Sequence, residues 1–138
     1  MMRYLWLLLI PLFNYSCKDE PAQTQDIFHA WEAKEFISIE SFYYPKIEGN
    51  KILLNIESPN SYQLKLDHNQ CNGQISQLSH SKIVFQSAGC TKICCDSKFS
   101  QKLVEMLPQV TSYHLDNNKL NLYIDGWGSI LFQQIQLE

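Results

Sequence analysis

Residues 62–66 (Tyr-Gln-Leu-Lys-Leu) decide the fold class, because apolar and polar side chains alternate there without a break. A period of two residues is typical of a β-strand with one buried face and one solvated face. Similar runs, some of them shorter or less regular, occur at 31–39, 52–57, 83–85, 120–124 and 130–132. Short runs at such intervals predict a β-rich domain.

Turn-forming residues between these runs indicate how the strands pair. Glycine, asparagine and aspartate tolerate a positive φ or cap their own backbone, so they favour tight hairpins. Such residues occur at Gly49-Asn50, Asn72-Gly73, Asp116-Asn117-Asn118 and Asp125-Gly126. The long crossover connections that parallel strands need are absent. We therefore expect an antiparallel sheet.

One segment, residues 96–107, breaks the alternation and predicts a helix. Its apolar side chains recur at helical spacing. They are Phe99, Leu103, Val104, Met106 and Leu107. Asp96 or Ser97 can cap the start of this helix, and Pro108 prevents its continuation. We expect the apolar face to pack on the sheet, which gives an α+β domain.

The composition fits one globular domain and argues against a nucleic-acid partner. The chain has 138 residues, of which 45% are hydrophobic and 18% charged, unlike collagen-like, coiled-coil or disordered chains. Its 11 basic and 14 acidic residues give a net charge of −3, and no basic run occurs. A protein that binds nucleic acid through phosphates should be basic or carry a basic stripe.

The first 16 residues are typical of an export signal. Arg3 supplies a positive start, and residues 4–13 (YLWLLLIPLF) form an uninterrupted apolar run. This run is too short to cross a bilayer, which takes about 20 apolar residues, but it suits the apolar region of a signal peptide. Pro11 and the lack of a polar face argue against a buried helix. Residues 1–16 are thus predicted to be a lipoprotein signal peptide.

The small residue Ser16 directly before Cys17 resembles the lipobox of bacterial lipoproteins, in which the cysteine thiol takes a diacylglycerol. Asn14 and Tyr15 depart from the usual lipobox residues. The alternative is an ordinary secreted protein in which Cys17 has no such role. With lipidation, Cys17 is the membrane anchor of an outer-membrane lipoprotein on the periplasmic or cell-surface face.

The residues after Cys17 indicate where the lipoprotein is sent. Lys18, Asp19 and Glu20 resemble a short signal that one Gram-negative phylum uses to export lipoproteins to the cell surface. Residues 17–27 contain few large apolar side chains, as expected of a flexible acidic tether. The predicted globular domain then spans residues 28–138.

Four cysteines remain once Cys17 is set aside, and in an exported protein an even number indicates disulfides. They are Cys71, Cys90, Cys94 and Cys95, which allow three pairings. A zinc site with His68 or His80 is an alternative, but no Cys-x2-Cys pair exists. A redox-active pair near the predicted helix start is a second alternative.

No catalytic constellation is visible in the chain. The four histidines (His29, His68, His80 and His114) share no spacing, and no hydrolase, metalloprotease, phosphate-loop or calcium-loop motif occurs. We therefore expect neither an enzyme nor a cofactor or metal ion.

Aromatic side chains are concentrated in the first two-thirds of the mature chain, and they allow two interpretations. They are Phe28, Trp31, Phe36, Phe42, Tyr43, Tyr44, Tyr62 and Phe85. Inside a small barrel they would fill the core, which we favour. In an incompletely closed barrel they would line an apolar groove for a lipid or peptide.

The order of these features is similar to that of the META domain of the HslJ-like heat-shock proteins. In that family a Cys-Asn turn is followed by Thr-x-Met-Ala-Cys, a helix and a closing Leu-x-Leu hairpin. Here Trp31 precedes Cys71-Asn72, residues 91–95 read Thr-Lys-Ile-Cys-Cys, and residues 120–122 read Leu-Asn-Leu. The similarity covers about residues 28–135. The family's Gly-x-Tyr after the Cys-Asn turn is missing.

The resemblance implies a small antiparallel, cracked β-barrel-like domain with one packed helix. Family members are exported or membrane-attached and are linked to stress responses, drug tolerance and secretion. The resemblance therefore implies a non-catalytic binding or envelope-maintenance lipoprotein, whose partner is a lipid, a peptide or an envelope protein. The alternative is a thiol-disulfide redox protein that uses Cys94 or Cys95.

The resemblance also bears on the disulfides. Cys71 and Cys95 take the places of the family's two separated cysteines, while Cys90 and Cys94 look like additions. We predict a Cys71–Cys95 bridge that fastens the helix to the barrel, with Cys90 bonded to Cys94. Two other pairings stay open: Cys71 with Cys94 beside Cys90 with Cys95, and Cys71 with Cys90 beside a bond between the neighbours.

Overall fold

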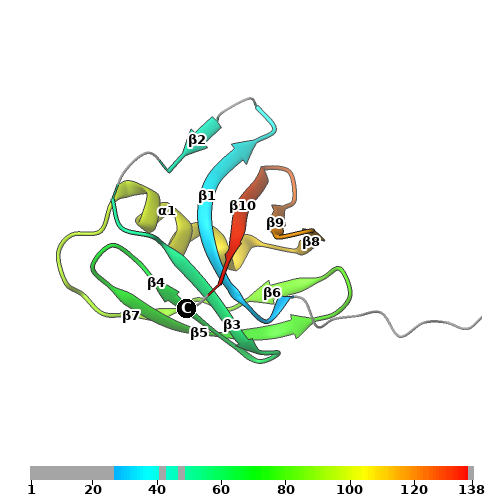
Figure 1. Ribbon diagram of the computed structural model, residues 1–138, viewed down its shortest axis with the longest axis horizontal. Coiled ribbons are helices and arrows are strands. Elements are labelled where there is room, and N and C mark those ends of the chain that lie inside the picture. The colour runs from blue at the N-terminus through cyan, green and yellow to red at the C-terminus, as the bar shows by residue number, and fades with distance from the viewer. Residues whose placement is uncertain (1–26, 41–42, 47–48, 137–138) are drawn as a thin grey trace, which may run out of the picture.

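The computed structural model describes residues 27–40, 43–46 and 49–136, which form a ten-stranded sheet and an α-helix (Figure 1). The strands are β1 (Ala30–Ser38), β2 (Tyr43–Pro45), β3 (Leu53–Ser58), β4 (Ser61–Lys65), β5 (Gln70–Leu78), β6 (Ile83–Phe85), β7 (Gly89–Cys90), β8 (Ser112–Asp116), β9 (Lys119–Ile124) and β10 (Gly128–Ile135). The helix α1 (Lys98–Met106) leads directly into a short 3-10 helix, η2 (Leu107–Gln109).

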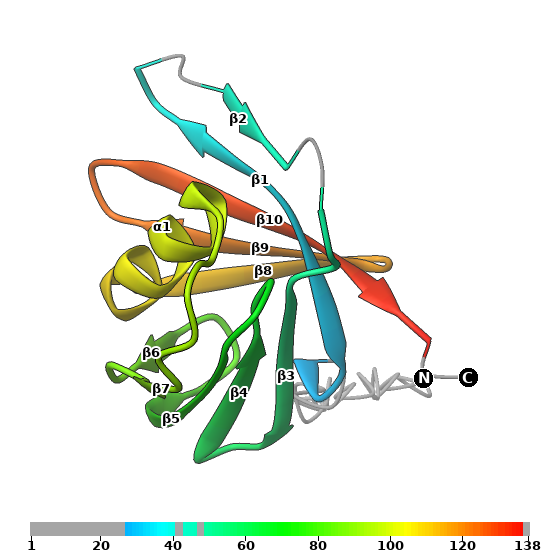
Figure 2. The ribbon, with the colours of Figure 1, turned by 90° about the vertical axis from the view of Figure 1, so that its left-hand side faces the viewer.

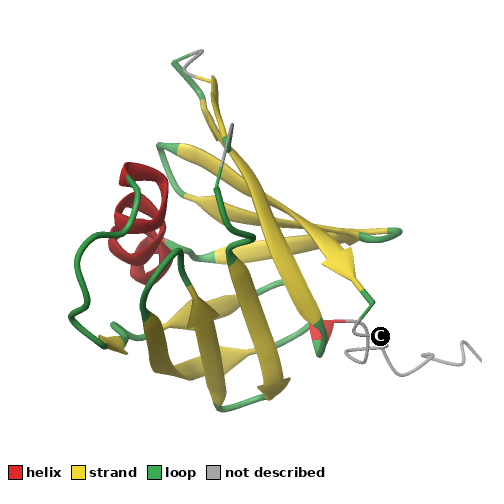
Figure 3. Ribbon diagram, turned by 60° about the vertical axis from the view of Figure 1, so that its left-hand side comes forward, coloured by secondary structure: helices red, strands yellow, loops and turns green. Residues whose placement is uncertain are grey.

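The strands form one antiparallel sheet that curls back on itself. Hydrogen-bonded neighbours follow the order β6-β5-β4-β3-β1-β10-β9-β8, while β2 pairs with β1 and β7 pairs with β5. The two ends of this order meet at Tyr113 of β8, whose backbone N–H donates to Ser81 O (2.9 Å) and whose hydroxyl donates to Ser79 O (2.8 Å). Figure 3 shows the nearly closed barrel with the helix beside it. The expected α+β class and antiparallel barrel-like fold are confirmed.

Strand β1 changes partner along its length, and this positions the site described below. Residues 30–32 pair with β3, whereas residues 35–37 pair with β2. On its other side β1 pairs with β10, with a shift of register between Ala33 and Glu35. An extra residue in one strand bends it. The far end of β1 therefore leaves the β3 side of the barrel together with β2, as Figure 2 shows.

The core fills the barrel with the alternating apolar side chains that the sequence predicted, including Leu64 and Leu122. The largest fully buried side chain is Trp31, whose indole Nε1–H donates to Ile27 O (2.9 Å). This bond satisfies the only polar group of the indole, so burial of the ring leaves no donor unpaired.

The predicted helix is confirmed, and it packs against the barrel. Ser97 caps it, since its Oγ accepts a hydrogen bond from the backbone N–H of Ser100 (3.2 Å). Phe99, Leu103 and Met106 are buried against the core. The α-helix ends at Met106, one residue earlier than predicted, and Pro108 lies in η2, whose start tolerates a residue without an N–H donor.

The prediction of a turn at Asn72-Gly73 is wrong, because both residues lie inside β5. Gly73 pairs with Tyr62 of β4, and a Cβ at this position would collide with the Tyr62 ring. This glycine provides room for a side chain rather than a positive φ. The Tyr62 hydroxyl donates to Gln86 O, and burial raises the pKa of Tyr62 to about 12.

Two of the other predicted turns connect hairpins as expected. Asn117, with a φ of 52°, lies between β8 and β9, and Gly126, with a φ of 71°, lies between β9 and β10. Strands β2, β5, β7 and β8 were not predicted. Two of these, β2 and β7, span only three and two residues, too few to establish a period of two.

Candidate functional site

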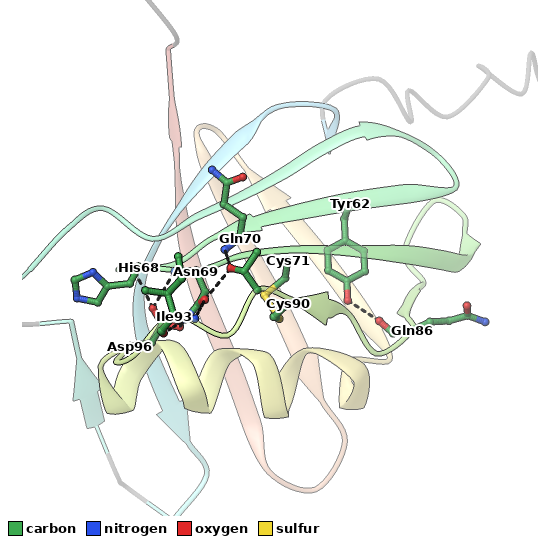
Figure 4. Close-up of a disulfide and its surroundings, with 10 residues drawn as sticks. Tyr62, His68, Asn69, Gln70, Cys71, Gln86, Cys90, Ile93 and Asp96 are labelled. Carbon is green, nitrogen blue, oxygen red and sulfur yellow. Dashed lines mark hydrogen bonds between the residues drawn. A yellow bond between two sulfur atoms is a disulfide. The ribbon is translucent and has the colours of Figure 1, made fainter.

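The structure joins Cys71 to Cys90, so the predicted Cys71–Cys95 bridge is wrong. Cys71 of β5 lies directly opposite Cys90 of β7, with their Cα atoms 4.0 Å apart (Figure 4). Strand β7 was not predicted, and without it nothing in the sequence places Cys90 beside Cys71. The bridge fastens β7 to the barrel and not, as we expected, the helix.

The predicted Cys90–Cys94 bond is also wrong, because the structure pairs Cys94 with its neighbour Cys95 across a cis peptide bond. Both side chains are exposed, in the loop between β7 and α1. Their expected position near the helix start is confirmed. All four cysteines are within disulfide distance of a partner, as the predicted framework requires.

Asn69 fixes the loop that carries this pair, a role that no sequence pattern predicted. Its side-chain oxygen accepts from the Thr91 hydroxyl and from the Ile93 N–H, both at 2.7 Å. Its amide nitrogen donates to Ile93 O (2.7 Å) and to the Asp96 carboxylate (2.6 Å). Figure 4 shows these groups converging beside the Cys71–Cys90 bridge. Every polar atom of the Asn69 side chain has a partner, so the cluster is a structural clamp.

Asp67 holds the start of α1 in a similar way. Its Oδ2 accepts hydrogen bonds from the Ser97 hydroxyl (2.7 Å), the Ser97 N–H (3.1 Å) and the Ser100 hydroxyl. Burial alone would raise the pKa of Asp67, but the hydrogen bonds from Ser100 and Ser97 outweigh it and hold the pKa below the ordinary value. A negative charge is also stabilised at a helix N-terminus.

A hollow of about 410 Å³ opens at the end of the barrel where β1 terminates, and we name it the aromatic groove. It lies between the end of β1, strand β2, helix α1 and the β9–β10 turn. Its lining consists of Phe36, Ser38, Ile39, Glu40, Tyr44, Lys102, Gly126 and Trp127. This volume is within the range of small-molecule sites.

Aromatic rings that pack on one another form the wall of the aromatic groove. The ring of Phe36 lies 4.7 Å from that of Phe99 and 6.2 Å from that of Trp127, measured between centroids. Tyr44 stacks on Phe99 at 6.1 Å with an interplanar angle of 16°. Such distances are typical of favourable aromatic pairs. The groove therefore has a wall held by packing on the helix.

The interpretation as core residues is confirmed for Trp31, Phe36, Tyr62 and Phe85, which are buried. Tyr44 is 43% exposed and lines the hollow, whose wall the buried ring of Phe36 also borders. Sequence analysis missed Trp127, although its place directly after the Asp125-Gly126 turn marks it as a large apolar residue at a barrel end.

Lys102 of α1 supplies a positive charge to the aromatic groove. Its Nζ lies 5.1 Å from the ring centroid of Trp127 and 5.6 Å from that of Phe36. These distances are typical of cation–π contacts. In the described part of the chain, no carboxylate forms an ion pair with Lys102. The ammonium is therefore held against the aromatic rings without an ion pair to a described carboxylate.

A second hollow of about 370 Å³ adjoins the aromatic groove around the β9–β10 turn. The two hollows share Ser38, Ile39 and Gly126. Ile37 and Tyr123 extend the apolar lining into the second hollow, and Asp125 lies at its border. Ile39 is 70% exposed between the hollows, and with Ile37 and Tyr123, each 40% exposed, it adds to the apolar surface around them.

Among the described residues, no group of three His, Cys, Asp or Glu side chains is arranged to hold a metal ion. Within the same ranges, none of the helical segments has the length and apolar character needed to cross a membrane. The predicted lipidation site Cys17 and the predicted export signal Lys18, Asp19 and Glu20 lie outside the described residues, as does Phe42.

Comparison with known proteins identifies the family but no individual relative. The family model for the META domain matches residues 22–136, which is most of the chain. The resemblance stated from the sequence is thereby confirmed. No curated protein and no solved structure matches the chain significantly.

Proposed function

The chain belongs to the META domain family, and from this premise we propose that it is a non-catalytic binding module of the bacterial cell envelope. The aromatic groove is its binding site, and a ligand with an apolar body is what it holds. One observation supports this proposal above the others: the large apolar side chains of Ile39 and Tyr44 stay exposed around a hollow at the end of β1.

The proposal includes a membrane anchor at Cys17, on the strength of the apolar run and the Ser16-Cys17 pair. The described chain then begins at the end of β1 that is away from the groove. Ala30 and Ser38 lie at opposite ends of β1, about 26 Å apart at the usual rise of a strand. The described chain begins at Ile27, near Ala30, whereas the groove lies at Ser38.

The anchor is tested by labelling cells with a palmitate analogue. The wild type should incorporate the label and Cys17→Ala should not, and equal labelling of both proteins would exclude an anchor at Cys17. Exposure on the cell surface is tested by protease treatment of intact cells. Replacing Lys18, Asp19 and Glu20 together by alanine should protect the protein; unchanged cleavage would remove these residues as the export signal.

The groove is tested by fluorescence quenching in protein produced from the full chain and reconstituted in phosphatidylcholine vesicles. The neutral probe 11-bromoundecanol should quench Trp127, whose signal is obtained by subtracting the spectrum of Trp127→Phe. Ile39→Glu places a charge in the groove and should abolish this quenching. Ile93→Glu is the matched control, because Ile93 is also an exposed isoleucine (59%) but lies outside the groove. Equal quenching in both variants would refute the site.

A second candidate function rests on the exposed pair Cys94 and Cys95. In a thiol–disulfide exchange, this bond would open to two thiols while a partner dithiol is oxidised to a disulfide. Titration with a thiol reagent after mild reduction tests the idea. Two reactive thiols, one of them with a lowered pKa, that are both lost in the double variant Cys94→Ala with Cys95→Ala would favour this function, whereas unreactive thiols would exclude it.

A further inference from the structure

The charge and shape of the aromatic groove indicate the chemical class of its ligand. This inference rests on the proposed function, in which the groove is the binding site. We propose that the ligand is a single-chain carboxylate amphiphile, whose carboxylate pairs with Lys102 and whose acyl chain lies along the two joined hollows.

The sign of the head group follows from how Lys102 is held. An aromatic wall such as Phe36 and Trp127 could in principle attract a cationic ligand. Here the Lys102 ammonium already lies against both rings, at 5.6 and 5.1 Å. A second cation would meet like charge at that place, whereas an anion would meet an ammonium that no described carboxylate pairs with.

The acidic groups near the groove fix the direction of the ligand. Glu40 lines the aromatic groove, but it is not within ion-pair distance of Lys102. Asp125 lies at the border of the second hollow, which no lysine or arginine lines. Charge complementarity therefore places the head group at Lys102 and sends the chain toward Ile39 and Ile37, away from the helix.

The backbone around the groove favours an acyl chain over an extended peptide. A peptide that binds beside a sheet usually adds a strand to a free edge through main-chain hydrogen bonds. At residues 35–37, β1 is already paired with β2 on one side and with β10 on the other. The outer edge of β2 has no described partner strand, but β2 spans only three residues and offers a peptide few main-chain hydrogen bonds. An acyl chain needs no such bonds, and a run of apolar side chains through Tyr44, Ile39 and Tyr123 is sufficient for it.

The test compares two probes of equal length in the vesicle assay described above: 11-bromoundecanoate and 11-bromoundecanol. Both should quench Trp127 in the wild type, and the carboxylate should bind more tightly. Lys102→Gln should weaken the carboxylate about fivefold to tenfold and leave the alcohol unchanged. Lys98→Gln removes the same charge from an exposed position of α1 outside the groove and should change neither affinity.

The outcomes separate this inference from the proposed function. If both probes bind equally and Lys102→Gln alters neither affinity, the groove is a purely apolar site, and the proposed carboxylate head group is refuted. If a quaternary ammonium probe of the same length binds more tightly than the carboxylate, the sign of the head group is wrong. If a peptide with a free carboxylate competes and the fatty acid does not, the acyl chain is wrong. If no probe quenches Trp127, the proposed function itself fails.

Discussion

Removing the bridge between Cys71 and Cys90 should destabilise the domain substantially, whereas removing the neighbouring pair should not. The first change is the double substitution Cys71→Ala with Cys90→Ala, and the second is Cys94→Ala with Cys95→Ala. The two variants lose the same number of cysteines, so they differ mainly in the length of chain that the bond closes: the partners are 19 residues apart in the first pair and adjacent in the second.

The expected magnitude follows from the entropy of the unfolded chain. Closing a loop of this length restricts the unfolded state by about 3 kcal/mol in the chain-entropy account, whereas a bond between neighbours restricts it far less. For a domain of this size, about 3 kcal/mol corresponds to a fall of about 12 °C in Tm. Cys71 is buried, so its truncation adds a smaller loss from the cavity that it leaves.

Urea denaturation followed by circular dichroism measures these free energies of unfolding. Comparing oxidised and reduced wild-type protein separates the covalent bond from the cavity, because reduction leaves the side chains in place. We expect reduction to account for most of the loss in the Cys71/Cys90 variant, and the Cys94/Cys95 variant to lose less than about 1 kcal/mol. Equal losses in the two double variants would refute the role of loop length, and no loss in either would refute the pairing.

Two further predictions concern residues that the fold positions closely. Asp67→Asn should cost about 1 kcal/mol at pH 7, because a carboxylate accepts the hydrogen bonds at the helix start better than an amide. The folded pKa of Asp67 is depressed, so this difference should be present well above pH 3.8 and be lost as the pH falls below it; a difference independent of pH in urea titrations would contradict this. Gly73→Ala should cost about 1–3 kcal/mol because its Cβ meets the Tyr62 ring, while the control Gly89→Ala, with open space around its Cβ, should cost nothing measurable. Equal unfolding midpoints for the two alanine variants would contradict this prediction and would mean that the Tyr62 ring can move aside for the added Cβ.

The sequence correctly predicted those strands and the helix whose apolar side chains recur at a regular spacing. Residues 62–66 and 120–124 alternate because one face of each strand enters the barrel, so burial pattern and sequence pattern coincide there. The helix could also be predicted, since its apolar face and its Ser97 cap depend on residues close together in the sequence. Asn72-Gly73 was misread for the opposite reason. Its glycine is required by the ring of Tyr62, a residue eleven positions earlier that only the pairing of β4 with β5 brings near.

The disulfide pairing could not be predicted for the same reason: it depends on contacts between residues that are far apart in the sequence. Which thiol faces Cys71 depends on β7, a strand of two residues that has no period of its own and exists only because it pairs with β5. Family positions pointed to Cys95, but that residue lies in the loop fixed by the Asn69 clamp, where its neighbour Cys94 is its partner. The number of cysteines at disulfide distance could thus be predicted from the composition and the expected export, whereas the pairing could not.

The aromatic groove arises where the alternation of β1 fails, and this connects the fold to the proposed function. The register shift around Lys34 bends β1, so Phe36 remains buried while Ile37 and Ile39 beyond it reach solvent. Exposed isoleucines at the end of a strand do not contribute to the core, and natural sequences break a local pattern mainly at functional sites. Lys102 then reaches the same place from a helix more than sixty residues later. A site assembled from β1, β2, α1 and a turn leaves no motif in the sequence, because its parts come together only in the folded barrel.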